Sequence, residues 1–304
     1  ILGRFMQRGE RMTARESALA NLSTGLEGTT RGLDWKASVG RGVSWLSNND
    51  QNYFNAALWA VATGNGLIDP TVDTNSQALI DSLKVSPTRV ARSTLDTAQV
   101  QLSGEATTLP AGSVQFAVGA AYYREHLVDT PDILLQTNNV QGAVQQSGVD
   151  ASRHNDALFV EFKVPVLATV EAQLAVRHDR YPSVSETSPK AALGWHVLSH
   201  WLMRTSYTHS FRAPVLKQLY GAREQSAATV TAPEQCQILT GNPVCTLAVF
   251  QLSGSNPDLK PEKAVTWNVG TAFDHQALSA SVDYWRIEKE QAILQEKYKD
   301  TAIY

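Results

Sequence analysis

Few side chains of this chain have the types and spacing that catalysis or metal binding requires. His196 and His200 are four residues apart, but they lie in a segment that predicts a strand and a turn, where this spacing does not create a metal-binding face. His209 and Ser210 are the only adjacent candidates for a Ser–His pair, and neighbouring strand residues point to opposite faces. The sequence has no G-x-S-x-G, G-x-x-x-x-G-K-[ST] or H-E-x-x-H motif. It therefore predicts a protein that is not an enzyme, with no metal site and no cofactor.

The two cysteines, Cys236 and Cys245, form the other candidate pair for chemistry. They lie in one polar segment, and none of the seven His residues falls within it, so metal ligands are lacking. Two nearby cysteines in an oxidising compartment predict a disulfide. Closing a loop of this length would stabilise it by roughly 2–3 kcal/mol in the chain-entropy model.

The elements that must position these residues are strands with apolar and polar side chains in alternation. We expect about eleven of them, which predicts an all-β fold. They are Leu2–Arg8, Arg15–Thr29, Leu33–Leu46, Thr94–Thr108, Ser113–Leu127, Asn155–Val164, Val170–Tyr181, Lys190–Val197, Trp201–Ser210, Glu262–Asp274 and Ala277–Glu288.

The links between these strands alternate between short and long. Tight turns are predicted at Thr30–Gly32, Leu109–Gly112, Leu198–His200 and Asp274–Gln276, whereas long polar links run roughly through 47–93, 128–153 and 211–261. Two short helices are predicted in the first link, from the spacing of Tyr53 to Val61 and of Leu79 to Leu83, and we expect them to form a small loop core. Short turns on one side and long loops on the other are typical of an antiparallel transmembrane β-barrel of the outer membrane.

Two tryptophans on one face of the Leu33–Leu46 strand support this interpretation. Trp35 and Trp45 are separated by ten residues, about 33 Å at ~3.3 Å per residue, or roughly 25 Å along the membrane normal for a tilted strand. Trp favours both boundaries of a bilayer because its ring is apolar and its N–H needs a polar partner. Arg41 on the same face is tolerable only near the outer boundary. The alternative is that both tryptophans belong to the core of a soluble sandwich.

The same alternation predicts which side chains meet lipid and which meet the aqueous lumen. We expect lipid at Phe162, Leu174, Val269, Leu278 and Val282. We expect the lumen at Glu171, Arg177, Asn268, Ser279, Ser281 and Asp283.

Net charge and hydrophobicity argue against two other classes of protein. A net charge of −3 argues against a general nucleic-acid-binding protein, and no run of 18 apolar residues is present that could form a transmembrane helix. We expect the chain to be an internal piece of a longer protein, because it starts without an initiator Met and shows no signal peptide. An odd number of antiparallel strands does not close a barrel in the usual bacterial way, so we expect further strands outside this sequence.

Two motif blocks about forty residues apart resemble the barrel signature of TonB-dependent outer-membrane receptors. One runs from Tyr207 to Pro214, followed by Gln218-Leu219-Tyr220; the other runs from Gly254 to Lys263 and leads into Trp267-Asn268-Val269-Gly270. The segments 109–125 and 281–287 are also similar to hairpins and strands of this family. The resemblance implies that residues 1–304 belong to the receptor β-barrel domain, with the plug domain and the closing strands outside this sequence.

The resemblance also implies a function. Such receptors have a barrel of about 22 strands around a plug, bind a scarce nutrient from outside and import it with TonB-coupled energy. Their substrates are commonly ferric siderophores, haem or cobalamin, and sometimes carbohydrates. The expected partners are the TonB complex, outer-membrane lipid and a small-molecule ligand, in a Gram-negative bacterium. A passive porin, an adhesin-like β protein and an outer-membrane hydrolase remain alternatives.

The two motif blocks and the long loop between them supply the candidate substrate contacts, although the simpler role of these residues is to end strands. These candidates are Arg212, Tyr220, Arg223, Asp258 and Lys260. Trp267 and Tyr284 join Trp35 and Trp45 as expected lipid-interface aromatics.

Overall fold

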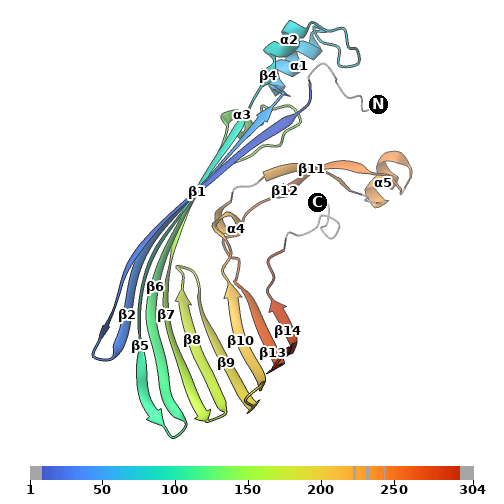
Figure 1. The fold of residues 1–304 in the computed structure, drawn as a ribbon. Coiled ribbons are helices and arrows are strands. Elements are labelled where there is room, and N and C mark those ends of the chain that lie inside the picture. Colours follow the sequence, from blue (N-terminus) through green and yellow to red (C-terminus); the bar gives the residue numbers. More distant parts are fainter. Residues whose placement is uncertain (1–8, 222–223, 231–232, 243, 295–304) are drawn as a thin grey trace.

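The computed structural model describes residues 9–221, 224–230, 233–242 and 244–294, most of which form one curved antiparallel sheet (Figure 1). Its ten strands are hydrogen-bonded in the order β1-β2-β5-β6-β7-β8-β9-β10-β13-β14, so each strand pairs with its neighbour in this order. Their bounds are Met12–Thr30 (β1), Leu33–Gln51 (β2), Thr88–Leu109 (β5), Gly112–Pro131 (β6), Val149–Leu167 (β7), Val170–Arg180 (β8), Ser185–Leu198 (β9), Trp201–Arg212 (β10), Glu262–His275 (β13) and Leu278–Glu290 (β14).

The predicted all-β antiparallel fold is confirmed. Ten of the predicted strands coincide with the ten strands of this sheet, and the remaining one, Leu2–Arg8, lies outside the described residues. Several strands are longer than predicted: β2 continues to Gln51, β5 begins at Thr88 and β7 begins at Val149. These extensions are rich in polar residues, so their period-two pattern is weak and the sequence alone assigned them to loops.

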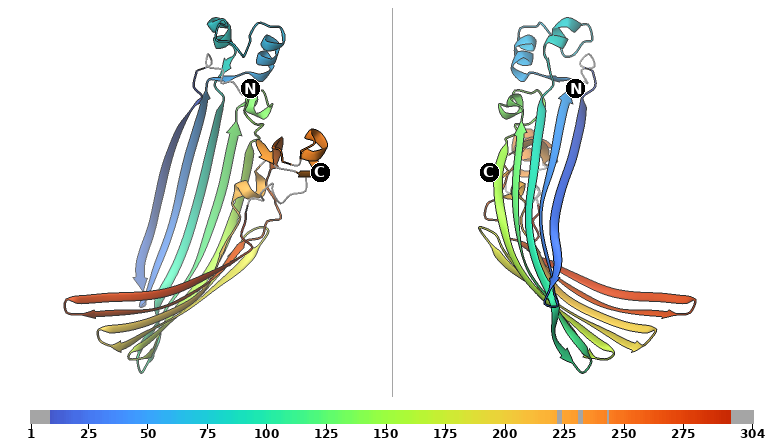
Figure 2. Two further views of the ribbon diagram at one scale, coloured as in Figure 1. Left: turned by 90° about the vertical axis from the view of Figure 1, so that its right-hand side faces the viewer. Right: turned by 60° about the vertical axis from the view of Figure 1, so that its left-hand side comes forward.

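The alternation of short and long links is also confirmed. The β1–β2, β5–β6, β7–β8, β9–β10 and β13–β14 turns each leave two residues between strands and lie together at one end of the sheet (Figures 1 and 2). In the first turn, Arg31 and Gly32 both have positive φ, 53° and 78°, as a two-residue turn matching the twist of its strands requires. At the opposite end, links 52–87, 132–148 and 213–261 carry helices or small hairpins, whereas link 181–184 is short.

The long links contain the remaining elements. None of the helices in the described ranges has the length and apolar character needed to cross a bilayer. The elements are β3 (Tyr53–Phe54), α1 (Ala56–Gly64), α2 (Gln77–Ser82), β4 (Lys84–Val85), α3 (Ile133–Gln136), α4 (Leu216–Tyr220), β11 (Glu224–Val230), α5 (Pro233–Thr240) and β12 (Leu247–Ser253).

The first long link has its own small core, as predicted. Asn55 begins α1, and its side chain accepts a hydrogen bond from the Leu58 backbone N–H at 3.1 Å. The Trp59 ring stacks on the Phe54 ring with 4.6 Å between centroids. The buried side chains that hold α1 and α2 together are Phe54, Ala62, Ile68, Ile80 and Leu83. This lobe therefore stands above the sheet as a compact unit rather than as an open loop.

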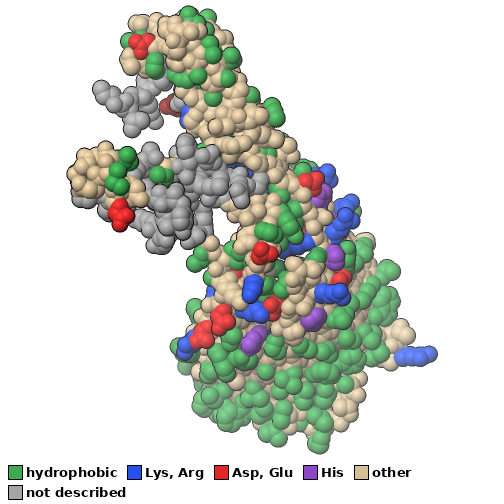
Figure 3. All heavy atoms as spheres, turned by 180° about the vertical axis from the view of Figure 1, so that it is seen from behind, with side chains coloured by type: hydrophobic (Ala, Val, Ile, Leu, Met, Phe, Trp, Pro, Cys, Tyr) green, Lys and Arg blue, Asp and Glu red, His purple; other side chains and the backbone are tan. Residues whose placement is uncertain are grey.

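The pleat of the sheet separates an outer face from an inner face. We define the outer face by the side chains in register with Val39 and Leu158, and the inner face by those in register with Asn155 and Arg177. Most exposed apolar side chains of the central strands, such as Val100, lie on the outer face. Seen from behind, the lower part of the molecule is covered by a broad apolar region with charged and His side chains above it (Figure 3).

The pairing registers place the two predicted sets of side chains on opposite faces. Phe162 lies opposite Leu174, and Val269 opposite Tyr284, all on the outer face. Asp283 lies opposite Gly270, and Arg177 opposite Phe159, on the inner face. The separation is therefore confirmed, whereas contact of these faces with lipid and water stays a prediction.

One close approach on the inner face makes a specific stability prediction. A Cβ at Gly119 would lie 2.4 Å from Phe159 Cζ and 2.6 Å from the Val100 carbonyl oxygen. We expect Gly119→Ala to destabilise the full-length protein by about 1–3 kcal/mol, the usual cost of overpacking. Gly42→Ala is the matched control, because its Cβ would meet only Asn21 Oδ1 at 3.8 Å. Thermal unfolding in detergent would measure both, and equal melting temperatures would contradict this packing.

Candidate functional site

The inner face carries a group of polar and aromatic side chains near the loop end of the sheet, next to a cavity of about 430 Å³. Adjacent strands supply them because alternate residues of β6, β7 and β8 point inward at the same level. The cavity is also lined by Leu95, Ser188, Ser210 and Phe211. We call the following residues the inner-face cluster: Tyr123, Glu125, Arg153, Asn155, Arg177, Asp179 and Tyr181.

Asp179 is the hub of one half of the cluster. Its side chain is 5% exposed, and its carboxylate accepts hydrogen bonds from Arg177 Nε at 2.8 Å and from Arg177 Nη2 at 2.9 Å. Asn155 Nδ2 donates a third hydrogen bond to the same carboxylate at 3.0 Å. A carboxylate buried to this degree is tolerated only with such charged and hydrogen-bonding partners.

Arg153 is the hub of the other half. Its Nε donates to Glu125 Oε2 at 2.9 Å, and its guanidinium carbon lies 5.0 Å from the centre of the Tyr181 ring. Arg153 Nη1 also donates to the backbone carbonyl of Pro214, at the start of the longest link. Burial raises the pKa of the Tyr181 hydroxyl, and the nearby Arg153 charge partly opposes that effect. Tyr181 is therefore a neutral hydrogen-bonding group at physiological pH, held between Arg153 and Phe211.

One polar atom of the cluster has no partner within the described part of the protein. The Oδ1 atom of Asn155 is buried and accepts no hydrogen bond, while its Nδ2 is engaged by Asp179. A buried acceptor without a donor is costly and calls for an explanation. Asn155 Oδ1 is enclosed by the protein, so the acceptors that a solute in the cavity could reach are the Tyr181 hydroxyl and the Glu125 carboxylate. The described residues contain no group of three His, Cys, Asp or Glu side chains able to hold a metal ion.

The loop residues predicted from sequence lie elsewhere. Arg212 Nε donates to Glu262 Oε2 at 2.7 Å across the ends of β10 and β13, so this contact joins two strand ends. Tyr220 ends α4 and is 48% exposed, and Lys260 is exposed just before β13. The backbone N–H of Asp258 donates to Asn256 Oδ1 at 2.9 Å in a turn. None of these four residues lines the cavity, and Arg223 lies outside the described residues, so direct substrate contact by this set stays a prediction.

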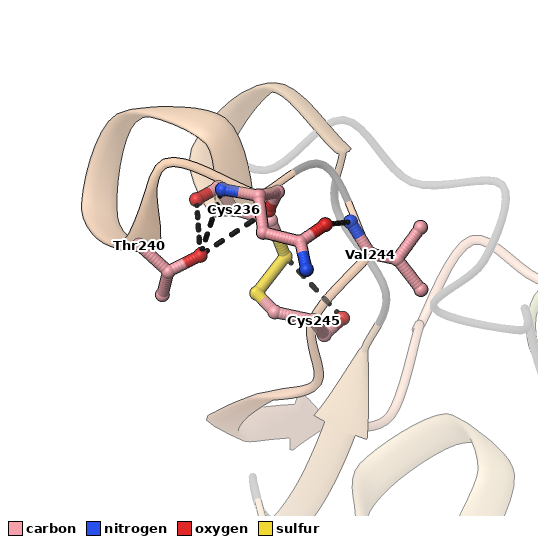
Figure 4. Close-up of a disulfide and its surroundings, with 5 residues drawn as sticks. Cys236, Thr240, Val244 and Cys245 are labelled. Atoms are coloured by element: carbon pink, nitrogen blue, oxygen red, sulfur yellow. Dashed lines mark hydrogen bonds between the residues drawn. A yellow bond between two sulfur atoms is a disulfide. The ribbon is translucent and has the colours of Figure 1, made fainter.

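The cysteine segment forms a small folded unit of the same loop. Cys236 of α5 and Cys245 are joined by a disulfide, with 5.5 Å between their Cα atoms (Figure 4). Thr240 Oγ1 donates to the Cys236 carbonyl at 2.8 Å, and the Val244 N–H donates to Asn242 Oδ1 at 2.8 Å. The disulfide therefore closes a short turn after α5.

The predicted interface aromatics lie on the outer face at different heights. Trp35 covers Gly28 near the tight-turn end of the sheet, where a Cβ would lie 3.0 Å from its ring. Trp45 lies beyond Arg41, and the Arg92 guanidinium carbon is 5.8 Å from the centre of its ring. Trp267 packs beside Tyr207, with 4.5 Å between ring centroids. Tyr284 is 69% exposed on the edge strand β14, and the membrane role of these four residues stays a prediction.

Sequence reasoning placed Arg177 on the polar face, but it did not single out Asn155, Asp179, Arg153 or Tyr181. The available signal was the alternation of the strands that became β7 and β8, which already set Asp179 beside Arg177 on one face. What was missing is the pairing register, because only the register brings Asn155 and Asp179 into contact.

The chain was compared with known proteins. The family described as "TonB dependent receptor-like, beta-barrel" matches residues 4–301. No curated protein matches the sequence. Among solved structures, the RagAB peptide importer in its "closed-closed" state is similar, with a TM-score of 0.56 at 15% identity, covering 92% of this chain and 30% of that one. The siderophore receptor PirA from Acinetobacter baumannii gives 0.52 at 14% identity, covering 85% and 34%. The chain thus spans about a third of these proteins, and the likeness at this identity concerns the fold.

Proposed function

The chain belongs to the TonB-dependent receptor-like β-barrel family, and we propose that it is part of the barrel wall of an outer-membrane receptor that imports a scarce small-molecule nutrient. The observation that carries the proposal is the inner-face cluster. It places charged and aromatic side chains beside a cavity, below the long loops. Solutes entering from the loop end would meet this surface.

The two faces of the sheet support the same proposal. Strands can cross a bilayer only when their backbone groups are paired and their outward side chains are apolar. Each strand between β1 and β14 is hydrogen-bonded to a neighbour on both sides, and the central strands expose Val and Leu side chains outward. In this proposal the edges β1 and β14 pair with further strands of the same barrel, because lipid does not tolerate open edges. A plug domain in the lumen would carry the contact with the TonB complex.

The side chains of the inner-face cluster indicate the chemical character of the substrate. Arg153 is paired with Glu125 and Arg177 with Asp179, so the cluster presents both N–H donors and carboxylate acceptors. A polar solute with both acceptors and donors fits this surface. Ferric siderophores, haem, cobalamin, oligosaccharides and short peptides all belong in a test panel; the similar solved structures include a peptide importer and a siderophore receptor.

Competition binding and uptake with the full-length protein test the proposal. We expect saturable, high-affinity binding of one panel compound, and uptake into cells that stops when TonB is deleted or the proton gradient is collapsed. Uptake that is unsaturable and independent of TonB would instead establish a passive porin. Recovery of the protein in the soluble fraction without detergent would refute both.

A further inference from the structure

The outer face of the sheet is hollowed where small side chains meet. A groove of about 1100 Å³ crosses β1, β2, β5, β6, β7 and β8. Ala37, Ala98 and Ala120 lie in its floor, with the larger Leu26, Val39 and Leu158 around them. The registers Val39–Ala98 and Ala120–Leu158 show that these side chains share the outer face. A groove with these apolar walls fits a hydrocarbon chain better than a polar solute.

The loop-side end of the groove has a different chemistry. Tyr122, Asp156, His178 and Arg180 line it there. One step further along the strands, Arg124 lies opposite His154, whose ring stacks with Tyr122 at 6.2 Å between centroids. The apolar groove therefore ends at a polar rim on the same face.

The rim has an excess of positive charge that the described residues do not neutralise. Arg124 and Arg180 are exposed, and no ion pair joins either to a carboxylate within the described ranges. Arg124 lies opposite Asp96, but both oxygens of that carboxylate bind Arg41, at 2.6 and 3.1 Å. Asp156 is the acidic residue of the rim itself and lies opposite Arg180. Two guanidinium groups thus stand beside one carboxylate, and the imidazoles of His154 and His178 lie at the same rim.

We propose that this groove and its rim form a binding site for one phosphate-bearing membrane lipid, with an acyl chain in the groove and the phosphate at Arg124 and Arg180. The orientation rests on the proposed function, which places the outer face in lipid. Arginine suits this task because its planar group binds phosphate through two parallel N–H donors and is weakly hydrated. Arg124 is four residues from Ala120 along β6, about 13 Å at ~3.3 Å per residue, so one lipid can reach both.

Charge complementarity favours a lipid over a protein partner. An apolar groove alone would accept an apolar side of another protein, but Arg124 and Arg180 lie at the end of the groove, as the phosphate of a lipid lies at the end of its acyl chains. A free phosphate would use the rim without the groove. A neutral diacylglycerol would use the groove without the rim.

Native mass spectrometry of the detergent-solubilised full-length receptor tests the site with three probes: phosphatidylglycerol, diacylglycerol and inorganic phosphate. We expect one phosphatidylglycerol to be retained, and its bound fraction to fall about tenfold in the Arg124→Gln/Arg180→Gln double variant. Ala98→Leu, which fills the groove, should give a similar loss. Matched controls are Arg92→Gln, on the same face beside Trp45, and Ala172→Leu, outside the groove; both should retain the lipid.

Three results would contradict the proposed lipid-binding site. They are equal retention by all variants, binding of diacylglycerol or inorganic phosphate as tight as that of phosphatidylglycerol, and a photo-crosslinker at position 98 that captures a protein in cells. Nutrient uptake separates this inference from the proposed function. Normal uptake with unselective lipid binding rejects only the lipid site, whereas selective lipid binding without TonB-dependent uptake rejects only the receptor.

Discussion

Placing an arginine on the outer face of β14 at Val282 should destabilise the membrane-inserted protein by about 2–4 kcal/mol, the cost measured for such residues near the midplane of outer-membrane barrels. Val282 lies midway between Leu278, next to the tight turn, and Arg286, where the outer face of this strand becomes charged. It is paired with Thr271, whose side chain also faces outward. The Thr271 hydroxyl already accepts a hydrogen bond from Trp201 Nε1 and donates one to the Leu202 carbonyl, so a guanidinium here would have to draw water or lipid headgroups into the bilayer.

Ser281→Arg is the matched control, because Ser281 is the neighbouring residue and belongs to the opposite face. It should cost little, since an arginine there remains in water. Urea titration of the full-length protein in lipid vesicles would compare the two free energies of unfolding. Equal losses, or a larger loss for Ser281→Arg, would show that the outer face does not contact hydrocarbon.

Replacing the hub of the inner-face cluster should have the second large effect. Asp179→Ala removes the acceptor of three hydrogen bonds, which come from the buried Asn155 and from the partly exposed Arg177. We expect a loss of about 1–3 kcal/mol in the free energy of unfolding, the usual cost of leaving buried polar groups unsatisfied. We also expect the affinity for the compound selected by the competition panel to fall at least tenfold, because Arg177 and Asn155 would reorient.

Asp150→Ala is the control for the removal of a carboxylate. Asp150 pairs with His126 on the surface, and its side chain is 74% exposed, so the variant should bind and unfold like the unaltered protein. Thermal unfolding and equilibrium binding would be measured on both proteins. If Asp179→Ala unfolded normally and kept its affinity, the inner-face cluster would be neither a structural hub nor a binding surface.

The inner face also explains two glycines that the sequence leaves unremarkable. Arg204 reaches over β13 to Asp283 of β14, with Nη2–Oδ2 and Nε–Oδ1 distances of 2.6 and 3.0 Å. A Cβ at Gly270 would lie 1.9 Å from Asp283 Oδ1, so only glycine lets this ion pair cross the intervening strand. Gly119 similarly accommodates the Phe159 ring. Each glycine therefore leaves room on the inner face for a side chain of the adjacent strand.

If the chain lines the lumen of a receptor, the inner-face cluster has a second consequence. Arg153 binds the Pro214 carbonyl, which ties the β7 wall to the first residues of the longest link. A solute that competes for Arg153 would loosen this tie, and movement of the link would in turn alter the cavity. Loop and wall therefore share one residue, which gives a direct physical route from binding to loop rearrangement.

The sequence by itself determined the class of the fold. Period-two alternation defined ten of the strands, and the unequal links defined the two ends, because both depend only on local spacing. The pair of cysteines and the two helical stretches in the first link were also local signals. The motif blocks around Phe211 and Pro257 pointed to the family for the same reason, since each is a short run of consecutive residues.

Only the tertiary structure decided where the chemistry lies. Asn155 and Asp179 are 24 residues apart, and their contact exists because β7 and β8 pair in one register. Shifting that register by one residue would turn the side chains of one strand to the other face, so the residues of the inner-face cluster would no longer be in contact. The groove on the outer face has the same origin, since Ala37, Ala98 and Ala120 come from three strands that only pairing aligns. The residues of each strand can be recognised from local alternation in the sequence. The inner-face cluster and the outer groove form only when strands that are distant in sequence pair in the correct register.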